Sequence, residues 1–221
     1  MIKAENLCKR YDDLTVLDNV NLHIPRGIFC MITGASGSGK STLLNILSRL
    51  DNADSGRLWL AGTEVTEITA ARLAALRREK IGFIFQSYNL ISDMPAWENV
   101  ALPLKYNRVK YFHRRSRAIE ALAKMGLEDK LYHLPHQLSG GQQQRVAVAR
   151  ALVTKPRILF CDEPTGNLDK ESAALVMGGI ISLRNSGSAI AMITPDNSLL
   201  KYADVVYKLE KGKLVENKQD R

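Results

Sequence analysis

The chain has 221 residues, of which 45% are hydrophobic and 24% are charged, and a formal net charge of +8. It is long enough to bury one sizeable core with a smaller subdomain, and it has neither an apolar run near the roughly 20 residues of a membrane span nor the apolar segment of a secretion signal, so we expect a cytosolic protein. The positive charge suits nucleic acid, an anionic membrane surface or a phosphate-bearing ligand, and does not choose among them.

Strand-like and helical segments alternate along the first third of the chain. Residues 19–24, NVNLHI, alternate apolar and polar side chains as a half-buried strand does, and residues 28–33, IFCMIT, form a continuous apolar run suited to a central strand. A glycine-rich loop follows, and a helix is expected from about Lys40 through STLLNILSRL. Periodicity predicts another helix over residues 71–79 and a strand over residues 81–86.

The middle of the chain has mainly helical signals, among them RRSRAIEALAKMGL and GGQQQRVAVARAL. We therefore expect one domain over residues 1–221, with a core of residues 1–86 and 153–221 and a helical subdomain of about residues 87–152. A buried strand over residues 157–164, further strand–helix alternation and a hairpin turning at Lys211–Gly212 complete the pattern. This alternation predicts an α/β fold with a largely parallel sheet flanked by helices and an antiparallel edge contributed by the early strands.

Neither the clustered positive charge nor the cysteines define a site by themselves. Much of the charge lies in residues 105–117, KYNRVKYFHRRSR, which we interpret as a solvated helix face with its entry loop rather than as a dedicated polyanion site. Cys8, Cys30 and Cys161 are widely spaced and form no zinc or disulfide motif. Cys30 and Cys161 lie in apolar runs, so we expect them to be small buried hydrophobic residues.

Residues 34–42, GASGSGKST, match the pattern G-x-x-x-x-G-K-[ST] between an apolar strand and a helix. Glycines let such a loop wrap its backbone N–H groups around phosphate oxygens, and the helix N-terminus adds partial positive charge. We expect Lys40 to reach the β- and γ-phosphates, Ser41 to hold Mg²⁺ and Thr42 to face the α-phosphate. The predicted phosphate-binding residues are Gly34, Ala35, Ser36, Gly37, Ser38, Gly39, Lys40, Ser41 and Thr42.

Two adjacent carboxylates, Asp162 and Glu163, follow the apolar run ILFC. Neighbouring side chains on a strand point to opposite faces, so the two can serve different tasks. Asp162 is expected to face Mg²⁺ through its water shell, and Glu163 to act on an attacking water as general base.

Two further segments are candidates for nucleotide contact. Tyr11 precedes the glycine-rich loop by the distance expected of an aromatic that stacks on adenine, although packing at a sheet edge explains it almost as well. In LSGGQ, residues 138–142, two glycines at a helix start let a phosphate approach the backbone, and Ser139 can donate a hydrogen bond to it. The predicted contacts from this segment are Ser139, Gly140, Gly141 and Gln142.

The phosphate loop, LSGGQ and DEP, in this order and spacing, resemble the ATP-binding cassette of ABC transporters over essentially the whole chain. The resemblance implies a P-loop NTPase (RecA-like) core with an antiparallel β edge and an inserted helical signature subdomain, with ATP and Mg²⁺ as cofactors. It also implies a head-to-tail dimer in which each ATP lies between the phosphate loop of one chain and the signature segment of the other, which here is LSGGQ. By position, Gln86 in FIFQS resembles the Q-loop glutamine near Mg²⁺ and the attacking water, and Tyr11 the adenine-stacking aromatic. GNLD, residues 166–169, resembles the D-loop, with Asp169 at the dimer seam.

Several segments are similar to cassettes of the lipoprotein-release, macrolide-export and FtsE type, namely GFIFQSYNLI, ENVALPL and DEPTGNLD, while HQLSGG and YADVVYKLEKGKL also resemble haem-exporter cassettes. Such cassettes work with a separate membrane-spanning permease subunit that carries an extracytoplasmic domain. The resemblance therefore implies a peripheral position at the cytoplasmic face of the inner membrane and a second cassette, as homodimer or heterodimer. ISDMPAW, which ends at Trp97, would help form the groove for a coupling helix, and internal packing is the alternative.

Pro195 stands where the family usually has the histidine of THD, between Thr194 and Asp196. That histidine contacts the γ-phosphate, and proline has neither its ring nitrogens nor a backbone N–H. The histidines of this chain lie elsewhere in the sequence and none is placed to substitute: His23, His113, His133 and His136. Because the loss of one transition-state contact costs about 10²–10³ in rate, our hypothesis is strong ATP binding with slow hydrolysis.

Two alternatives to a transporter ATPase remain. One is a hydrolysis-deficient clamp that signals by ATP binding, for which Pro195 is the main support. The other is a DNA-associated ABC ATPase, which we disfavour because the interval between the phosphate loop and LSGGQ is short, helical and free of cysteine motifs. We therefore expect no nucleic-acid partner.

Overall fold

Ten strands form two sheets in the computed structural model, which describes residues 1–166 and 168–217. The first sheet is antiparallel, with the order β2-β1-β4-β5. Its strands are β1 (Ile2–Tyr11), β2 (Leu14–Ile24), β4 (Ser55–Leu60) and β5 (Thr63–Glu64). The second sheet has the order β10-β9-β3-β8-β7-β6 and is parallel except at β10. Its strands are β3 (Phe29–Thr33), β6 (Ile81–Ile84), β7 (Ile158–Asp162), β8 (Ala189–Ile193), β9 (Val205–Glu210) and β10 (Lys213–Glu216).

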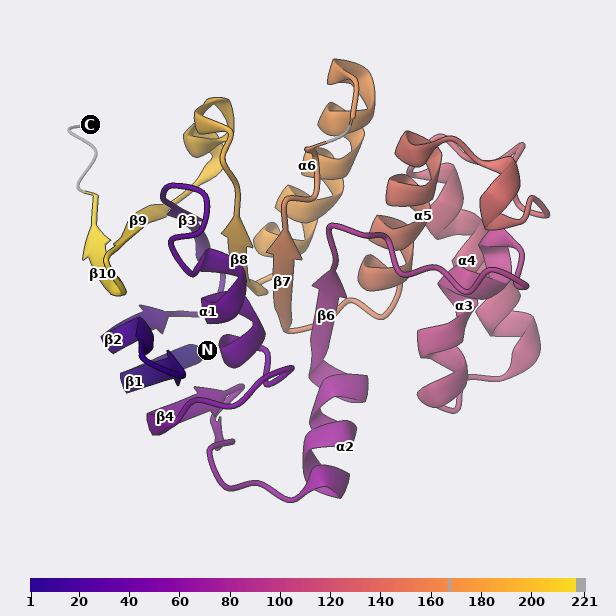
Figure 1. The fold of residues 1–221 in the computed structure, drawn as a ribbon. Coiled ribbons are helices and arrows are strands. Elements are labelled where there is room, and N and C mark those ends of the chain that lie inside the picture. The colour runs from indigo at the N-terminus through magenta and orange to yellow at the C-terminus, as the bar shows by residue number, and fades with distance from the viewer. Residues whose placement is uncertain (167, 218–221) are drawn as a thin grey trace.

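Helices cover the parallel sheet from two sides (Figure 1). The α-helices are α1 (Lys40–Leu47), α2 (Ala70–Lys80), α3 (Ala96–Tyr106), α4 (Tyr111–Ala123), α5 (Gly140–Leu152) and α6 (Lys170–Asn185), and the short 3₁₀ helices are η1 (Pro135–Gln137) and η2 (Asn197–Tyr202). The antiparallel sheet and α1 lie on one side of the parallel sheet, while α3, α4 and α5 gather beyond β6 (Figure 1). Within the described part of the chain, no helix combines the length and apolarity needed to cross a bilayer.

The continuous apolar runs of the central strands are explained by burial on both faces of the sheet. In β3, Phe29 and Met31 belong to the hydrophobic core shared with α3 to α6, whereas Cys30 and Ile32 belong to the core shared with α1 and the antiparallel sheet. Successive side chains of a strand point to opposite faces, so a strand covered on both sides must be apolar at every position. The same alternation runs along β7 and β8.

The expected fold class is confirmed, with differences in detail. The early strands pair with one another in a sheet of their own, and the antiparallel edge of the parallel sheet is β10. Helix α1 ends at Leu47, whereas STLLNILSRL predicted a helix through Leu50. The hairpin at Lys211–Gly212 joins β9 to β10 as predicted, and Cys30 and Cys161 are buried as expected. Strands β1, β4 and β5 and helix α3 were not specifically predicted.

Helices α3, α4 and α5 occupy most of residues 87–152 and pack on one another. Buried apolar side chains at helical spacing, such as Val100 and Leu104 of α3 and Ala118 and Leu122 of α4, form their common core. The division of the chain into a core and a helical subdomain at these boundaries stays a proposal.

Candidate nucleotide site

The phosphate loop joins the end of β3 to α1, and its path requires glycine at particular positions. Gly34, Gly37 and Gly39 have φ values of +149°, +74° and +96°. A Cβ on Gly34 would lie 2.6 Å from the Leu209 carbonyl oxygen, and one on Gly39 would lie 2.8 Å from Cγ1 of Val16. At Gly34 and Gly39 glycine accommodates both the positive φ and the close approach, whereas at Gly37 only the positive φ requires it, since no atom lies within 4 Å of its Cβ position.

Lys40 begins α1 and turns its side chain back over the loop. The Lys40 ammonium donates hydrogen bonds to the carbonyl oxygens of Gly34, at 3.0 Å, and Ala35, at 2.7 Å. Gly39 caps the helix without a side-chain hydrogen bond, and the first turn of α1 has no acidic residue. The loop therefore combines a lysine ammonium with the positive end of a helix, which is an arrangement that binds phosphate.

Glu163 is held in a strained backbone conformation at the end of β7. Its φ is +45°, in the left-handed region that non-glycine residues rarely adopt, and its N–H donates to the Ile193 carbonyl oxygen at 3.0 Å. The amide Nε2 of Gln86 donates to Oε2 of Glu163 at 3.3 Å. The structure thus brings together the two residues predicted for catalysis, and backbone strain of this kind clusters at functional sites.

Asp162 has the surroundings of a carboxylate that faces a cation. Burial, and then the neighbouring Glu163 carboxylate, raise the pKa of Asp162, while the Ser41 hydroxyl and the Lys40 charge act in the opposite direction. Its Oδ1 atom is buried without a hydrogen-bond partner among the described residues. Within that part of the chain, no group of three or more His, Cys, Asp or Glu side chains could hold a metal by itself. The oxygen atoms of Ser41 and Asp162 would be enough protein ligands for Mg²⁺, because this ion usually retains several water ligands and takes others from the substrate phosphates.

The LSGGQ segment begins α5 with a capping box. The Ser139 hydroxyl oxygen accepts a hydrogen bond from the Gln142 N–H at 3.3 Å, and Oε1 of Gln142 accepts one from the Ser139 N–H at 2.9 Å. Sites for a Cβ on Gly140 and Gly141 lie 3.1 Å from the Tyr88 hydroxyl and 3.4 Å from a Leu168 methyl. Gln142 is therefore occupied in capping, while the Ser139 hydroxyl keeps its own proton available for donation.

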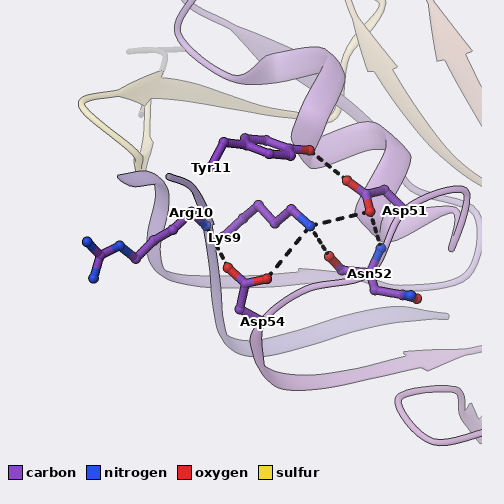
Figure 2. Close-up of polar contacts among 6 residues, drawn as sticks. All are labelled: Lys9, Arg10, Tyr11, Asp51, Asn52 and Asp54. Carbon is purple, nitrogen blue, oxygen red and sulfur yellow. Dashed lines mark hydrogen bonds and ion pairs between the residues drawn. The ribbon is translucent and has the colours of Figure 1, made fainter. Parts of the chain in front are cut away.

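Tyr11 ends β1 and has 46% of its surface exposed. Its hydroxyl donates to Oδ2 of Asp51 at 2.6 Å, and this hydrogen bond raises the pKa of Tyr11 and lowers the pKa of Asp51 (Figure 2). The Lys9 ammonium lies 4.9 Å from the centre of the Tyr11 ring and contacts the Asn52 carbonyl oxygen at 2.7 Å, Asp51 at 3.3 Å and Asp54 at 3.7 Å. The ring is thus fixed at its hydroxyl and flanked by a cation.

Pro195 follows the carboxyl end of β8, which lies between β3 and β7. The phosphate loop and Glu163 follow these two neighbours, so all three segments leave the sheet at the same edge. Thr194 is buried, and its hydroxyl oxygen accepts a hydrogen bond from the Asp196 N–H at 3.1 Å. The histidines lie in other elements, His23 in β2, His113 in α4, His136 in η1 and His133 just before η1.

The expected D-loop falls partly outside the described residues, because Asn167 is not among them. Asp169 caps the start of α6 by accepting a hydrogen bond from the Ser172 N–H at 2.9 Å. The backbone N–H and the side chain of Ser172 keep the pKa of Asp169 below its ordinary value. A role of Asp169 at a dimer seam stays a prediction.

Comparison with known proteins gives the family. Residues 17–166 match the family model described as ABC transporter. Over 220 residues the chain is 46% identical to the uncharacterized ABC transporter ATP-binding protein MJ1508 of Methanocaldococcus jannaschii, covering 98% of both chains. The chain belongs to the ABC transporter family.

Two other similarities refine this assignment. The chain is 44% identical over 219 residues to the macrolide export ATP-binding/permease protein MacB of Vibrio parahaemolyticus, covering 97% of this chain and 34% of that protein, so it spans about a third of MacB. A solved structure of the cassette MJ0796, dimeric, in a post-hydrolysis state and bound to ADP and Pi, has a TM-score of 0.92 and 38% identity over 98% of both chains. The chain is thus an ATP-binding ATPase cassette of the ABC transporter family.

Two residues that position the site of this cassette were not anticipated. The buried amide of Gln144 on α5 donates to the Pro164 carbonyl oxygen at 3.0 Å and so holds α5, the helix that begins with LSGGQ, against the segment after Glu163. Arg150, whose pKa is lowered by burial, donates to the carbonyl oxygens of Tyr88 and Asn89, both at 2.6 Å. It thereby fixes the loop that follows Gln86. Neither residue stands out in the sequence, because its role depends on contacts between distant segments.

Proposed function

We propose that this cassette forms a dimer with a second cassette and drives a separate membrane-spanning permease subunit from the cytoplasmic face of the inner membrane. The observation that carries the proposal is the meeting of Gln86 and Glu163 beside a complete phosphate loop. The dimeric state of the solved MJ0796 cassette supports pairing. MacB of Vibrio parahaemolyticus is an ATP-binding/permease protein, and the 44% identity of this chain to it supports a permease as the partner of the cassette. We extend the proposal to an extracytoplasmic domain on that permease.

Each ATP would lie between the phosphate loop of one cassette and Ser139, Gly140 and Gly141 of the other. In a single chain, no hydrogen bond joins residues 139–142 to residues 34–42 within the described part of the structure. The free proton of the Ser139 hydroxyl and the N-terminus of α5 are groups that favour a phosphate oxygen. Gln142 would act by holding the capping box, and Tyr11 would stack on the adenine ring.

The chain's own residues then divide the chemistry of ATP hydrolysis. Lys40 exchanges its hydrogen bonds to the loop carbonyls for phosphate oxygens, and Glu163 accepts a proton from the attacking water. Gln86, 3.3 Å from Glu163, orients that carboxylate and the water. Mg²⁺ supplies charge neutralisation for the phosphates when it is bound, and Ser41 and Asp162 are the residues that would hold it, with Gln86 beside it.

Pro195 sets the rate in this proposal. Its ring offers no hydrogen bond at the sheet edge shared by the phosphate loop and Glu163, so hydrolysis loses one contact to the γ-phosphate. The expected cost is about 10²–10³ in rate, with ATP affinity and dimer closure retained. The second candidate, a clamp that signals by binding ATP without hydrolysis, rests on the same residue. In a heterodimer, a partner with the histidine would retain one complete site.

Steady-state ATP hydrolysis and ATP affinity of the native chain, Pro195→His and Glu163→Gln test the proposal. We expect all three to bind ATP, the native chain to hydrolyse it slowly but above Glu163→Gln, and Pro195→His to be about 10²–10³ faster. A native rate equal to that of Glu163→Gln, restored by histidine, would favour the clamp. A native rate that histidine does not raise would show that Pro195 is not limiting.

A further inference from the structure

Four aromatic side chains at the end of α3, at the start of α4 and in the loop before η1 are largely exposed. Tyr106, Tyr111, Phe112 and Tyr132 have 63%, 60%, 79% and 63% of their surface exposed. Two of them contact neighbouring side chains. The Tyr111 ring packs edge-on against Trp97 at 6.1 Å, and the Tyr132 hydroxyl accepts a hydrogen bond from the Arg115 guanidinium at 2.7 Å. Large exposed aromatic side chains gathered on neighbouring segments point to an interaction site.

The same segments are strongly basic. The sequence has no Asp or Glu between Glu98 and Glu120, and this interval contains Lys105, Arg108, Lys110, Arg114 and Arg115 on or near the α3–α4 connection. Among the described residues, these five cations form no ion pair. Asp129, in the neighbouring loop, pairs instead with Lys130.

The position of this positive charge is also unfavourable for helix α4. Helix α4 begins at Tyr111 without an acidic residue in its first turn, and Arg114 and Arg115 lie close to this positive end of the helix dipole. Cations there disfavour the helix in isolation, and an anionic surface would offset both the dipole and the side-chain charges. The Arg114 guanidinium lies 5.5 Å from the centre of the Tyr111 ring, so an aromatic and a cationic group meet at the start of α4.

We propose that this surface, formed by Tyr106, Tyr111, Phe112, Tyr132 and the five cations and termed the aromatic–basic face, binds the anionic lipid headgroups of the bilayer beside the permease. Tyrosine favours the headgroup region, phenylalanine enters the acyl boundary, and lysine and arginine pair with lipid phosphates. The inference goes beyond the proposed function but rests on its placement of the cassette at a membrane.

Charge decides between lipid and permease as the occupant of this face. Cytoplasmic loops of membrane proteins carry an excess of lysine and arginine, which would repel five further cations. The cytoplasmic leaflet is negatively charged and attracts them. Contact with lipid would also orient the neighbouring Trp97 and the start of α3 relative to the membrane plane.

The test is co-sedimentation of the full chain with vesicles of phosphatidylcholine alone and with about a third phosphatidylglycerol, at several salt concentrations. Because any protein of charge +8 is drawn to anionic vesicles, two charge-matched double variants are compared. Lys110→Glu with Arg115→Glu alters the aromatic–basic face. Lys3→Glu with Lys213→Glu makes the same change in net charge on β1 and β10, away from α4 (Figure 1).

We expect binding that requires phosphatidylglycerol, falls with salt, and drops at least about tenfold in the first variant but less than about threefold in the second. Phe112→Ser, which leaves the charge unchanged, should weaken binding to the same vesicles by several fold and guards against misfolding of the charge variant. Equal losses in the two double variants, or no anionic-vesicle binding by the native chain, would overturn the proposal. Binding that needs the permease and ignores lipid charge would assign the face to the permease instead.

ATP affinity measured on the same variants separates this inference from the proposed function. It should be unchanged in all of them, since none of the altered residues belongs to the nucleotide site. A native chain that binds ATP but no anionic vesicle refutes the lipid face alone, whereas a chain that fails to bind ATP refutes the proposed function.

Discussion

Replacing Lys9 by methionine should weaken both the fold and the adenine platform. The Lys9 side chain is only 10% exposed, and its ammonium contacts the Asn52 carbonyl oxygen, Asp51 and Asp54 beside the Tyr11 ring (Figure 2). These contacts join the end of β1 to the segment that follows α1, the helix that begins at the phosphate loop. Methionine keeps most of the apolar stem and removes the charge, so the variant isolates the ammonium.

The magnitude follows from the exposure of each partner. The hydrogen bond from the ammonium to the Asn52 carbonyl oxygen, at 2.7 Å, has a charged donor and is worth about 1.5–3 kcal/mol. Asp51 and Asp54 have side chains that are 36% and 50% exposed, so water replaces much of the lost attraction and each pair adds at most about 0.2–1 kcal/mol. Lys9→Met should therefore lower the free energy of unfolding by about 2–5 kcal/mol.

Urea unfolding measures this loss, with Lys208→Met as the matched control. Lys208 pairs with Glu210 at 2.5 Å, but both side chains are more than half exposed, so that variant should lose less than about 1 kcal/mol. A Lys9→Met variant within about 0.5 kcal/mol of the native chain would refute the assignment of stability to the ammonium. A second arm compares affinities for ATP and for inorganic tripolyphosphate. If Lys9 positions Tyr11 for adenine, only the affinity for ATP should fall.

Two other features of the backbone give sharp expectations. Gly178 and Gly179 are adjacent in α6, yet a Cβ on Gly178 would meet nothing within 4 Å, while one on Gly179 would lie 2.8 Å from the Met125 methyl. Urea unfolding should show that Gly178→Ala is more stable than the native chain by about 0.5–1 kcal/mol, whereas Gly179→Ala is no more stable than the native chain. Equal gains in stability in the two variants would contradict the packing around Gly179. Glu163 has a φ of +45°, which glycine adopts without strain. The free energy of unfolding of Glu163→Gly should therefore exceed that of Glu163→Gln by about 1 kcal/mol, with hydrolysis lost in both variants. Equal free energies of unfolding would show that the strain is negligible.

The sequence predicted the parts of the fold that depend on local pattern. The strands that became β3 and β7 are unbroken apolar runs, and the loop between β3 and α1 has glycine where positive φ is needed. Strand β1 escaped detection because its alternation is interrupted: Asn6 has a φ of +53°, and the pairing with β2 shifts register between Ala4 and Leu7. Helix α3 contains Pro103, which argues against a helix in any reading of sequence alone.

Relations between distant segments were beyond the sequence. The early strands pair in their own sheet through hydrogen bonds between segments that are distant in the sequence. An alternating pattern of apolar residues indicates a strand but does not say which other strand it pairs with. The candidate site likewise combines features that the sequence pattern predicts with contacts that it does not. The types and order of its residues were predicted, whereas the capping role of Gln142, the bond from Gln86 to Glu163 and the Tyr11–Asp51 contact emerged from the structure.

Pro195 is compatible with the fold because the hydrogen bonds around it do not need a backbone N–H at this position. The Ile193 carbonyl oxygen accepts the Glu163 N–H, and the turn after β8 is closed by the Asp196 N–H on the Thr194 hydroxyl, so neither bond uses the amide of residue 195. Proline therefore removes no hydrogen bond from this turn and leaves the strained Glu163 backbone anchored. What it removes is a side chain at the edge where the γ-phosphate would lie. For this reason we expect the substitution to separate ATP binding from ATP hydrolysis, and Pro195→His to change the rate of hydrolysis far more than the stability of the fold.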